Sequence, residues 1–341
     1  MLFPDKKTIF LSILLMVTIG FLKADTITLN DCLYTDSPPQ IDGLLDDNCW
    51  KEAEAITGFF DFWTSGKPKM RTELKLCFDK KALYLGAVLF EDNIDKMRAA
   101  VASRDDPDYW KDDFVEICID PGNNPETSFK KFCVNPMGTQ VDIWQHDGDC
   151  DYAWNGDWQA KAKINKDRWV IEVAIPWDNF ERAPAEGDIW TFEFIRFAYS
   201  SGALQGVSLS PGARHGAPEK FGLLLFTNKS KNIENLVETI CRRKGDKWEL
   251  SLGGGKVLFE SYASIIHGLS QQEEELLARV EQDISEIEEN KKYSKICGAY
   301  KEEFEKILSS DNFEDQIIKL EGLIQRTAEL RWKAAIRALS E

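Results

Sequence analysis

Histidine is scarce in this chain, which has three in 341 residues: His146, His215 and His267. None of them stands in an H-E-x-x-H or C-x-x-C-H context, so the zinc-peptidase and c-type haem signatures are missing. The chain also lacks a G-x-S-x-G elbow, a P-loop and a G-x-G-x-x-G fingerprint. Carboxylates number 58, too many for any one pair to indicate a glycosidase. The sequence therefore predicts a protein that is not an enzyme.

Positive charge is also in deficit. The chain has 42 Lys and Arg against 58 Asp and Glu, which gives a formal net charge of −16. Such an acidic chain has no bulk attraction to nucleic acid or to an anionic membrane surface. Neutral polymers and cations remain as the expected partners.

Long apolar runs are absent, with one exception at the N-terminus. Lys6 and Lys7 precede the run "TIFLSILLMVTIGFL", and "KAD" follows it. A basic segment, an apolar segment and a small residue are typical of a secretory signal peptide. We therefore expect a signal peptide over 1–24 with cleavage near Ala24, and a secreted, periplasmic or cell-surface protein. The alternative is an uncleaved N-terminal anchor.

The eight cysteines fit no zinc motif, because no C-x-x-C occurs. Export would permit disulfides. Pairing of Cys32 with Cys49, or of Cys133 with Cys150, fits the spacing, but the sequence does not determine the connectivity. Cys118 lies inside a strand pattern and is expected as a small buried side chain.

Residues 25–227 have the pattern of a mainly β domain. Short runs such as "ELKLCFD", "ALYLGAVLF" and "RWVIEVAIP" are separated by Gly, Asn, Asp and Pro. A hairpin turn is expected at 165–167, and a short helix in "DDNCWKEAEAI". Many short strands without intervening helices predict an antiparallel β-sandwich of jelly-roll-like topology.

The sequence pattern changes from strand-like to helical in the C-terminal third. Residues 228–268 read as a linker that holds a short hairpin around 253–255. Apolar residues then recur at helical spacing over 269–341, which predicts a helical bundle or a coiled coil. This region is either a packing or spacer appendage or a surface for self-association or for a protein partner. The first helix would bury Leu277, Val280, Ile284 and Ile287, and the last would bury Ile317, Leu320, Ile324 and Trp332.

One stretch, "YWKDDFVEICIDPGNN" over 109–124, places a carboxylate in the middle of a strand. Val115, Ile117 and Ile119 alternate toward one face, which is expected to be the core. Glu116 points to the other face. A charge in a strand lies either at a solvated surface or in a site.

An ordered series of segments resembles the family 9 carbohydrate-binding modules in their broader family 9-like form. The series comprises "QIDGLLDDNCWKEAEAI", "LYLGAVLFED", "WKDDFVEICIDPGNN", "KKFCVNPMGTQVD", "DRWVIEVAIPWDNF", "GDIWTFEFIRF" and "SLSPGARHGAPEKFG". It covers nearly all of 40–226. The resemblance implies a secreted β-sandwich that binds plant-type polysaccharide such as xylan or cellulose, beside a glycoside hydrolase. It also implies structural calcium.

The resemblance assigns a sugar-stacking role to Trp110 and a hydroxyl-binding role to Glu116, and it places weaker polar contacts at Lys131 and Asn135. An aromatic ring suits the apolar face of a sugar, and a carboxylate suits its hydroxyl rim. The alternative is that Trp110 caps the sandwich and that Glu116 pairs with Lys131 or Arg196 across the sheet.

The chain departs from the family where many members have a Trp in an "S-W-S-P" segment. Here the segment is "SLSP", with Leu209 in that position. If members of the family use this Trp as a second stacking ring on the opposite side of the sugar, this chain has lost that second ring. Trp154 or Trp158, in an aromatic-rich loop, are the expected substitutes.

Asp147, Asp149 and Asp151 alternate in a loop, a pattern that suits a hard cation such as calcium. The loop is not an EF-hand, since Tyr152 stands where Gly is required and Trp158 where Glu is required. The alternative is a solvated acidic loop.

Two other functions fit the residues. One is a structural or assembly protein whose sandwich no longer binds sugar, which Leu209 and the large helical region favour. The other is a haem-binding electron-transfer domain of a related sandwich class, for which Met137 and His215 would be the axial ligands.

Overall fold

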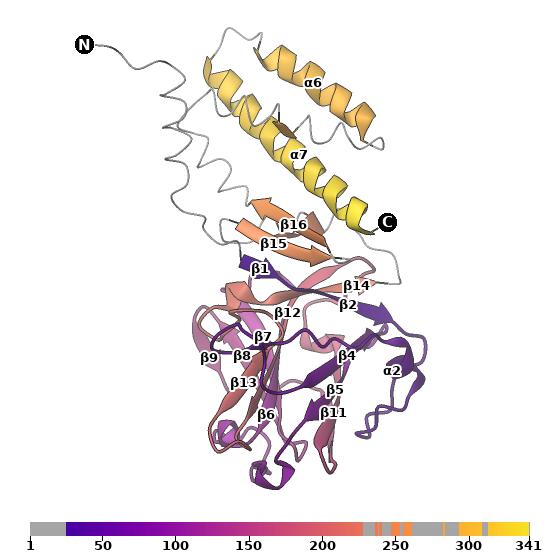
Figure 1. Cartoon of the computed structure of the whole chain (residues 1–341), viewed down its shortest axis with the longest axis vertical. Helices are drawn as coiled ribbons and strands as arrows, with labels where there is room; N and C mark the ends of the chain where they lie inside the picture. Colours follow the sequence, from indigo (N-terminus) through magenta and orange to yellow (C-terminus); the bar gives the residue numbers. More distant parts are fainter. Residues whose placement is uncertain are drawn as a thin grey trace, which may run out of the picture.

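The computed structural model describes residues 25–227, 236–237, 239–240, 247–252, 255–260, 282–283, 293–308 and 313–340. The predicted signal peptide over 1–24 lies outside the described residues. So does the predicted first bundle helix, apart from 282–283. Figure 1 shows the strands of the sandwich gathered at one end of the long axis and the C-terminal helices at the other.

Thirteen strands form one large curled sheet with the order β10-β11-β5-β4-β2-β14-β12-β6-β7-β8-β9, to which β13 and β3 are added beside β12. The first half comprises β10 (Gln159–Ile164), β11 (Arg168–Pro176), β5 (Ala82–Phe90) and β4 (Thr72–Phe78). The second half comprises β14 (Gly222–Thr227), β12 (Ile189–Ala198), β6 (Phe114–Asp120), β7 (Ser128–Val134), β8 (Gln140–His146) and β9 (Asp149–Asp151). The remaining strands are β2 (Leu29–Tyr34), β3 (Phe60–Asp61) and β13 (Gln205–Ser208).

The prediction of a purely antiparallel sandwich is wrong at β2, which joins the two halves. This strand pairs in parallel with β14 on one side and with β4 on the other. A parallel connection needs a long crossover, and residues 35–71 between β2 and β4 supply it. That crossover holds α2 (Asn48–Glu52), which confirms the predicted short helix. The predicted hairpin is confirmed as β10 and β11.

The two halves enclose the main apolar core. Val115, Ile117 and Ile119 on β6 are at most 1% exposed and lie in it, as their alternation predicts. They pack with Phe192 and Phe194 of β12 and with side chains of β4, β5 and β11. The opposite face of β6, which carries Glu116, is also buried, so another part of the chain covers it.

A buried carboxylate explains the Asp-Gly turn near the start of the domain. Glu172 on β11 accepts hydrogen bonds from the backbone N–H groups of Asp42, Gly43 and Leu44 and from Trp50 Nε1. Gly43 has a φ of +87°, which other residues adopt at a cost. This segment of the family pattern therefore holds the turn and the α2 region against β11.

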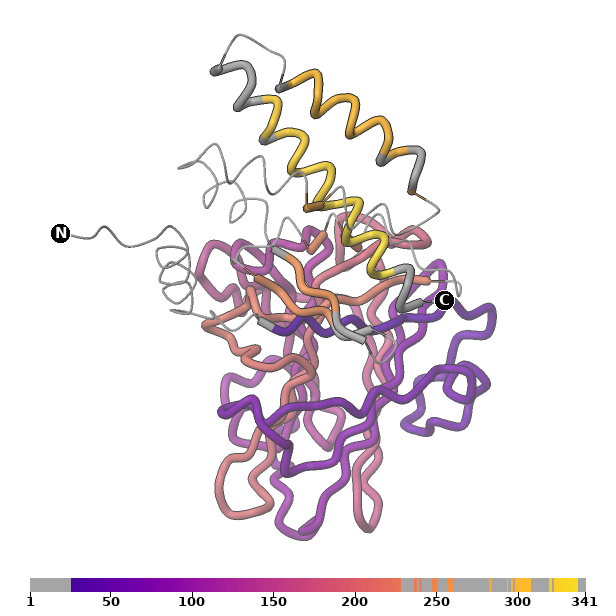
Figure 2. The backbone as a smooth tube through the Cα atoms, turned by 45° about the horizontal axis from the view of Figure 1, so that its top comes forward, coloured from indigo at the N-terminus to yellow at the C-terminus, as the bar shows by residue number. Residues whose placement is uncertain are grey.

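The predicted hairpin of the C-terminal third is confirmed as β15 (Lys247–Leu252) and β16 (Gly255–Glu260). It forms a three-stranded sheet with β1 (Asp25–Ile27), which pairs in parallel with β15. Figure 2 shows this hairpin between the sandwich and the helix α7 (Phe313–Ser340). A second helix, α6 (Ser294–Leu308), packs beside α7.

The hairpin and the helices share one apolar core with the end of the sandwich. Ile189, Leu223 and Leu225 of the sandwich belong to the same buried cluster as Phe259 of β16 and Trp332 of α7. The expected burial of Leu320, Ile324 and Trp332 is confirmed. The three-helix bundle and the coiled coil remain predictions, because most of the first helix is not described.

The six cysteines whose side chains the structure describes form no disulfide, and five of them are buried. Neither Cys32–Cys49 nor Cys133–Cys150 is formed. No helix in the described part of the chain is long and apolar enough to cross a membrane.

Candidate functional site

A cavity of about 460 Å³ opens on the outer face of β6 and β12. The short 3-10 helix η2 (Tyr109–Lys111) and the loop between β13 and β14 form part of its wall. Aromatic side chains predominate among its lining residues, which are Pro107, Tyr109, Trp110, Phe114, Glu116, Tyr152, Phe197, Tyr199, Leu204 and His215. The structure thus brings Trp110 and Glu116 together in one pocket.

Glu116 is the charged group at the base of this cavity. It is 1% exposed and forms a hydrogen bond through Oε2 with His215 Nε2. Lys131 Nζ lies 3.5 Å from Glu116 Oε1. Burial by itself would raise the pKa of Glu116, but Lys131 and His215 outweigh it and lower the pKa to about 2. The carboxylate is therefore ionised at neutral pH.

Aromatic rings form the apolar part of the same cavity. Phe114 and Phe197 are buried, with ring centroids 5.0 Å apart, while Trp110 and Tyr152 are 51% and 60% exposed. The cavity therefore joins an apolar wall and exposed rings to a buried ion pair. Such a combination binds a ligand with one apolar face and several hydroxyl groups.

The two aspartates between Trp110 and Phe114 hold the segment in place. Asp112 accepts hydrogen bonds from the backbone N–H groups of Ala100 and Val101. Asp113 accepts from the backbone of Tyr199 at 2.9 Å, and the Tyr199 hydroxyl donates to the carbonyl of Trp110. The "WKDD" segment is thus fixed by its acids, and this fixes the position of Trp110 at the rim.

Lys131 and Asn135 support the site from inside the protein. Lys131 is 5% exposed, and its pKa is raised because Glu116 outweighs the effect of burial. Glu116 thus pairs with Lys131, one of the two expected alternatives, whereas Arg196 pairs with Glu91 at 3.2 Å. Asn135 donates to Val101 and Asp112, and its Oδ1 accepts two backbone N–H groups. Neither residue lines the cavity.

The predicted substitute platforms lie elsewhere. Trp158 is 4% exposed, packs edge-on against Phe132 at 5.2 Å and donates to Asp142 at 3.1 Å. Trp154 is partly buried against the same Phe132, under the ammonium group of Lys130 at 4.9 Å. Neither ring lines the cavity of Trp110. Leu209 is buried in the core.

The comparisons with known proteins decide the family. The family described as "Carbohydrate family 9 binding domain-like" matches residues 41–228, more than half of the chain. The chain belongs to this family. The resemblance read from the ordered segments is therefore confirmed, and the chain carries a domain of carbohydrate-binding type. No curated protein matches the chain.

Solved structures similar to this chain include two of one bacterial module. One is a carbohydrate binding module family 9 from Caldicellulosiruptor kristjanssonii in complex with cellotriose, at 20% identity and a TM-score of 0.45. The match covers 60% of this chain and 96% of that one. The other is the module in complex with glucose, at the same identity and TM-score, with 60% and 98% covered.

The acidic loop of the family 9 domain does not fit a cation in this structure. Asp147 begins the turn into β9 with a φ of +49°, and Asp149 and Asp151 follow in that strand. Asp151 accepts the backbone N–H of Ala153. Among the described residues, no three His, Cys, Asp or Glu side chains gather as metal ligands. Calcium remains an untested prediction, and no role is derived from it.

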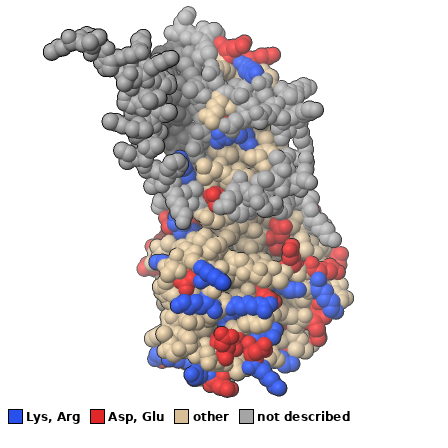
Figure 3. Space-filling view, in the orientation of Figure 1, with Lys and Arg blue, Asp and Glu red and all other residues tan. Residues whose placement is uncertain are grey.

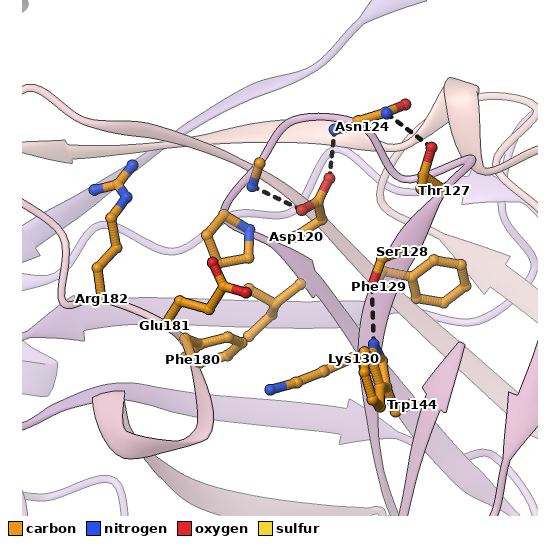
Figure 4. A pocket seen from close by; sticks show the side chains of 13 residues that line it. Asp120, Asn124, Thr127, Ser128, Phe129, Lys130, Trp144, Phe180, Glu181 and Arg182 are labelled. Carbon is orange, nitrogen blue, oxygen red and sulfur yellow. Dashed lines mark hydrogen bonds between the residues drawn. The ribbon is translucent and has the colours of Figure 1, made fainter. Parts of the chain in front are cut away.

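A second cavity of the family 9 domain, of about 340 Å³, lies beside β7. Figure 4 shows Glu181 and Arg182 on one side of it and Trp144, which donates to Ser128 at 2.9 Å, on the other. Its rings, Phe129, Trp144 and Phe180, are partly or fully buried. Because it offers no well-exposed ring, the cavity of Trp110 is the better candidate for sugar.

Sequence reasoning missed most of the pocket of the family 9 domain. His215 was considered only as a haem ligand with Met137, which is not among the residues that line the pocket. Tyr152, Phe197 and Leu204 were not selected. One signal existed, because His215 lies in the "SLSPGARHGAPEKFG" segment that carries the family resemblance.

Figure 3 shows Lys and Arg together with Asp and Glu over the sandwich face in view.

Proposed function

We propose that this chain is an exported, non-catalytic protein whose family 9 domain binds neutral plant-type polysaccharide of the xylan or cellulose kind. One observation carries the proposal: an exposed Trp110 ring stands in the same cavity as the buried Glu116 carboxylate and its partly exposed partner His215. A pyranose has an apolar C–H face and a rim of hydroxyls. The ring suits the face, and the carboxylate and the imidazole suit the rim.

The polar pair retains capacity for a ligand. A carboxylate has about four lone-pair positions, so Glu116 accepts from sugar hydroxyls in addition to its partners. The side chain of His215 is 41% exposed and is the polar group that a ligand reaches first. Because Glu116 has a pKa of about 2, it is poorly suited to proton transfer at neutral pH, which supports a binding role over a catalytic one.

Export rests on the predicted signal peptide. Mass spectrometry of the protein expressed in a secreting bacterium is expected to find a mature N-terminus near residue 25 outside the cytoplasm. An intact N-terminus in the membrane fraction would instead support an uncleaved anchor.

The proposed ligand is tested by calorimetry and pull-down against xylan, cellulose and short oligosaccharides. Wild type is expected to bind, and Trp110→Ala to lose about tenfold or more in affinity. Met137→Ala removes a 52% exposed apolar side chain that does not line the pocket and serves as the matched control. Equal binding by wild type and Trp110→Ala would place the site elsewhere.

A second candidate function is that of an assembly protein without sugar affinity. The buried Leu209, in the position where many members of the family have a Trp, favours it. Under that function, folded wild type binds nothing in the panel and self-associates through 269–341. A variant truncated at residue 268 that stayed oligomeric would contradict it.

A further inference from the structure

Two of the eleven tryptophans are more than one-third exposed. Trp110 is 51% exposed and Trp63 is 43% exposed, whereas the other nine are buried or partly buried. Trp63 lies in the turn that follows β3, far in sequence from the family motif around Trp110. Leaving a large ring in water forgoes favourable burial, so such a ring is a common mark of a binding surface.

A continuous row of aromatic contacts connects Trp63 with the pocket. Phe197, which lines the pocket, has its ring centroid 5.0 Å from that of Phe114 and 6.3 Å from that of Trp63. Phe62 fills the space between, 5.0 Å from Phe197 and 5.3 Å from Trp63. Aromatic rings therefore pack against one another all the way from the pocket to Trp63.

The turn that carries Trp63 is held in one conformation. The Asp61 carboxylate accepts the backbone N–H groups of Trp63 and Thr64 and the Thr64 hydroxyl, at 2.8–3.2 Å. Phe62 donates its N–H to the carbonyl of Gly206 on β13 at 3.0 Å. A ring held in this way loses little conformational entropy when a ligand stacks on it.

The same loop supports Trp63 and completes the pocket. Arg214 donates to the carbonyl of Trp63, and the next residue, His215, bonds Glu116 in the cavity. The ring of His215 also lies 6.4 Å from Phe62. The position of Trp63 is thus coupled to that of the polar group in the pocket.

We propose that Trp63 is a second stacking platform, which receives a further sugar unit of a chain whose first unit occupies the pocket of Trp110. The inference rests on the proposed function and deepens it. It makes the preferred ligand an oligosaccharide, because Trp63 is not among the residues that line the pocket of the first unit. Affinity therefore rises with chain length until both platforms are occupied.

Calorimetry with glucose, xylose and their β-1,4-linked oligosaccharides of increasing length tests the proposal. Trp63→Ala is expected to lower the affinity for oligosaccharides about tenfold and to leave the affinity for the monosaccharide within about twofold. Trp63→Phe retains a ring and is expected to preserve most of the gain with length. Trp110→Ala is expected to weaken monosaccharide and oligosaccharide alike.

This experiment distinguishes failure of the Trp63 inference from failure of the proposed function. An unchanged gain with chain length in Trp63→Ala overturns this inference alone. An equal loss for the monosaccharide and the oligosaccharides also overturns it, since Trp63 then only supports the pocket. Absence of sugar binding by folded wild type overturns the proposed function and this inference together. Thermal unfolding of each variant confirms that it is folded.

Discussion

Two buried carboxylates on neighbouring strands have pKa values that are shifted in opposite directions. Glu116 lies between Lys131 and His215, which lower its pKa to about 2 against the effect of burial. Glu193 on β12 is also fully buried, but it has only backbone N–H groups and a hydroxyl as partners, and burial raises its pKa to about 8. The cationic neighbour Lys131 lowers the pKa of Glu116, and this accounts for the opposite pKa shifts of the two carboxylates.

Glu116 is expected to stabilise the fold at neutral pH and to lose that effect in acid. Its pKa in the folded state lies below the ordinary value of 4.5, so its contribution to the free energy of unfolding is complete above that pH and disappears toward pH 2. Glu116→Gln leaves the Lys131 charge unpaired, and we expect a loss of about 3 kcal/mol at pH 7.

Urea unfolding of wild type and Glu116→Gln between pH 7 and 2 measures the contribution of Glu116 to the free energy of unfolding. The difference between the two proteins is expected to shrink as the pH falls. Asp167→Asn removes an exposed partner of Arg168 and is the control, with an expected change much smaller than that of Glu116→Gln. A difference between wild type and Glu116→Gln that stays constant with pH would contradict the assignment.

Glu193 is expected to act with the opposite sign. The folded state keeps its proton up to about pH 8, whereas the unfolded state releases it near 4.5, so stability falls as the pH rises between these values. Glu193→Gln cannot ionise, and its stability relative to wild type is expected to rise by more than about 1 kcal/mol from pH 5 to pH 8. Urea unfolding across this range tests it, and parallel curves for the two proteins would refute it.

At the scale of elements, the helix α7 is bound to the hairpin through one large ring. Trp332 is 1% exposed and its ring centroid lies 5.4 Å from that of Phe259 on β16. Arg331, the adjacent residue, pairs with the buried Asp283 at 2.6 Å. The helix is thus anchored to the shared core and to a neighbouring helical segment.

Trp332→Ala is expected to lower the free energy of unfolding by about 3–5 kcal/mol, because it removes a large buried ring and leaves a cavity. Chemical denaturation followed by circular dichroism measures the change. Glu305→Ala, on an exposed position of α6, is expected to change stability by less than about 0.5 kcal/mol. A small effect of Trp332→Ala would show that α7 does not contribute to the core.

At the scale of the whole molecule, the C-terminal third completes the fold of the sandwich. The cluster that contains Ile189, Leu223 and Leu225 is closed by residues of the hairpin and α7. Figures 1 and 2 show these elements stacked on one end of the sandwich. The pocket of Trp110 and Glu116 is built from residues 107–215 alone.

A protein that ends at residue 227 is therefore expected to expose this apolar cluster. We expect a lower thermal midpoint and aggregation in size-exclusion chromatography with light scattering, relative to the protein of residues 25–341. Its sugar binding at low concentration is expected to persist, because the pocket is intact. A monodisperse product with an unchanged midpoint would show that the C-terminal third is a separable appendage.

The sequence by itself determined the strands, the buried face of β6 and the family. Alternation with a period of two residues specifies which side of a strand is apolar, and this is a local property. It therefore placed Val115, Ile117 and Ile119 in the core, and the ordered segments of the family indicated the fold. The helical spacing of Leu320 and Ile324 specified their burial in the same way.

Tertiary structure alone decided which rings and charges form the site. Whether a tryptophan is exposed depends on what the rest of the chain packs against it, so the sequence selected Trp158, which is buried, and passed over Trp63, which is exposed. The partners of Glu116 come from β7 and from a loop about a hundred residues away, and only the folded sheet brings them together. The same holds for β2, because its parallel pairing depends on contacts distant in sequence.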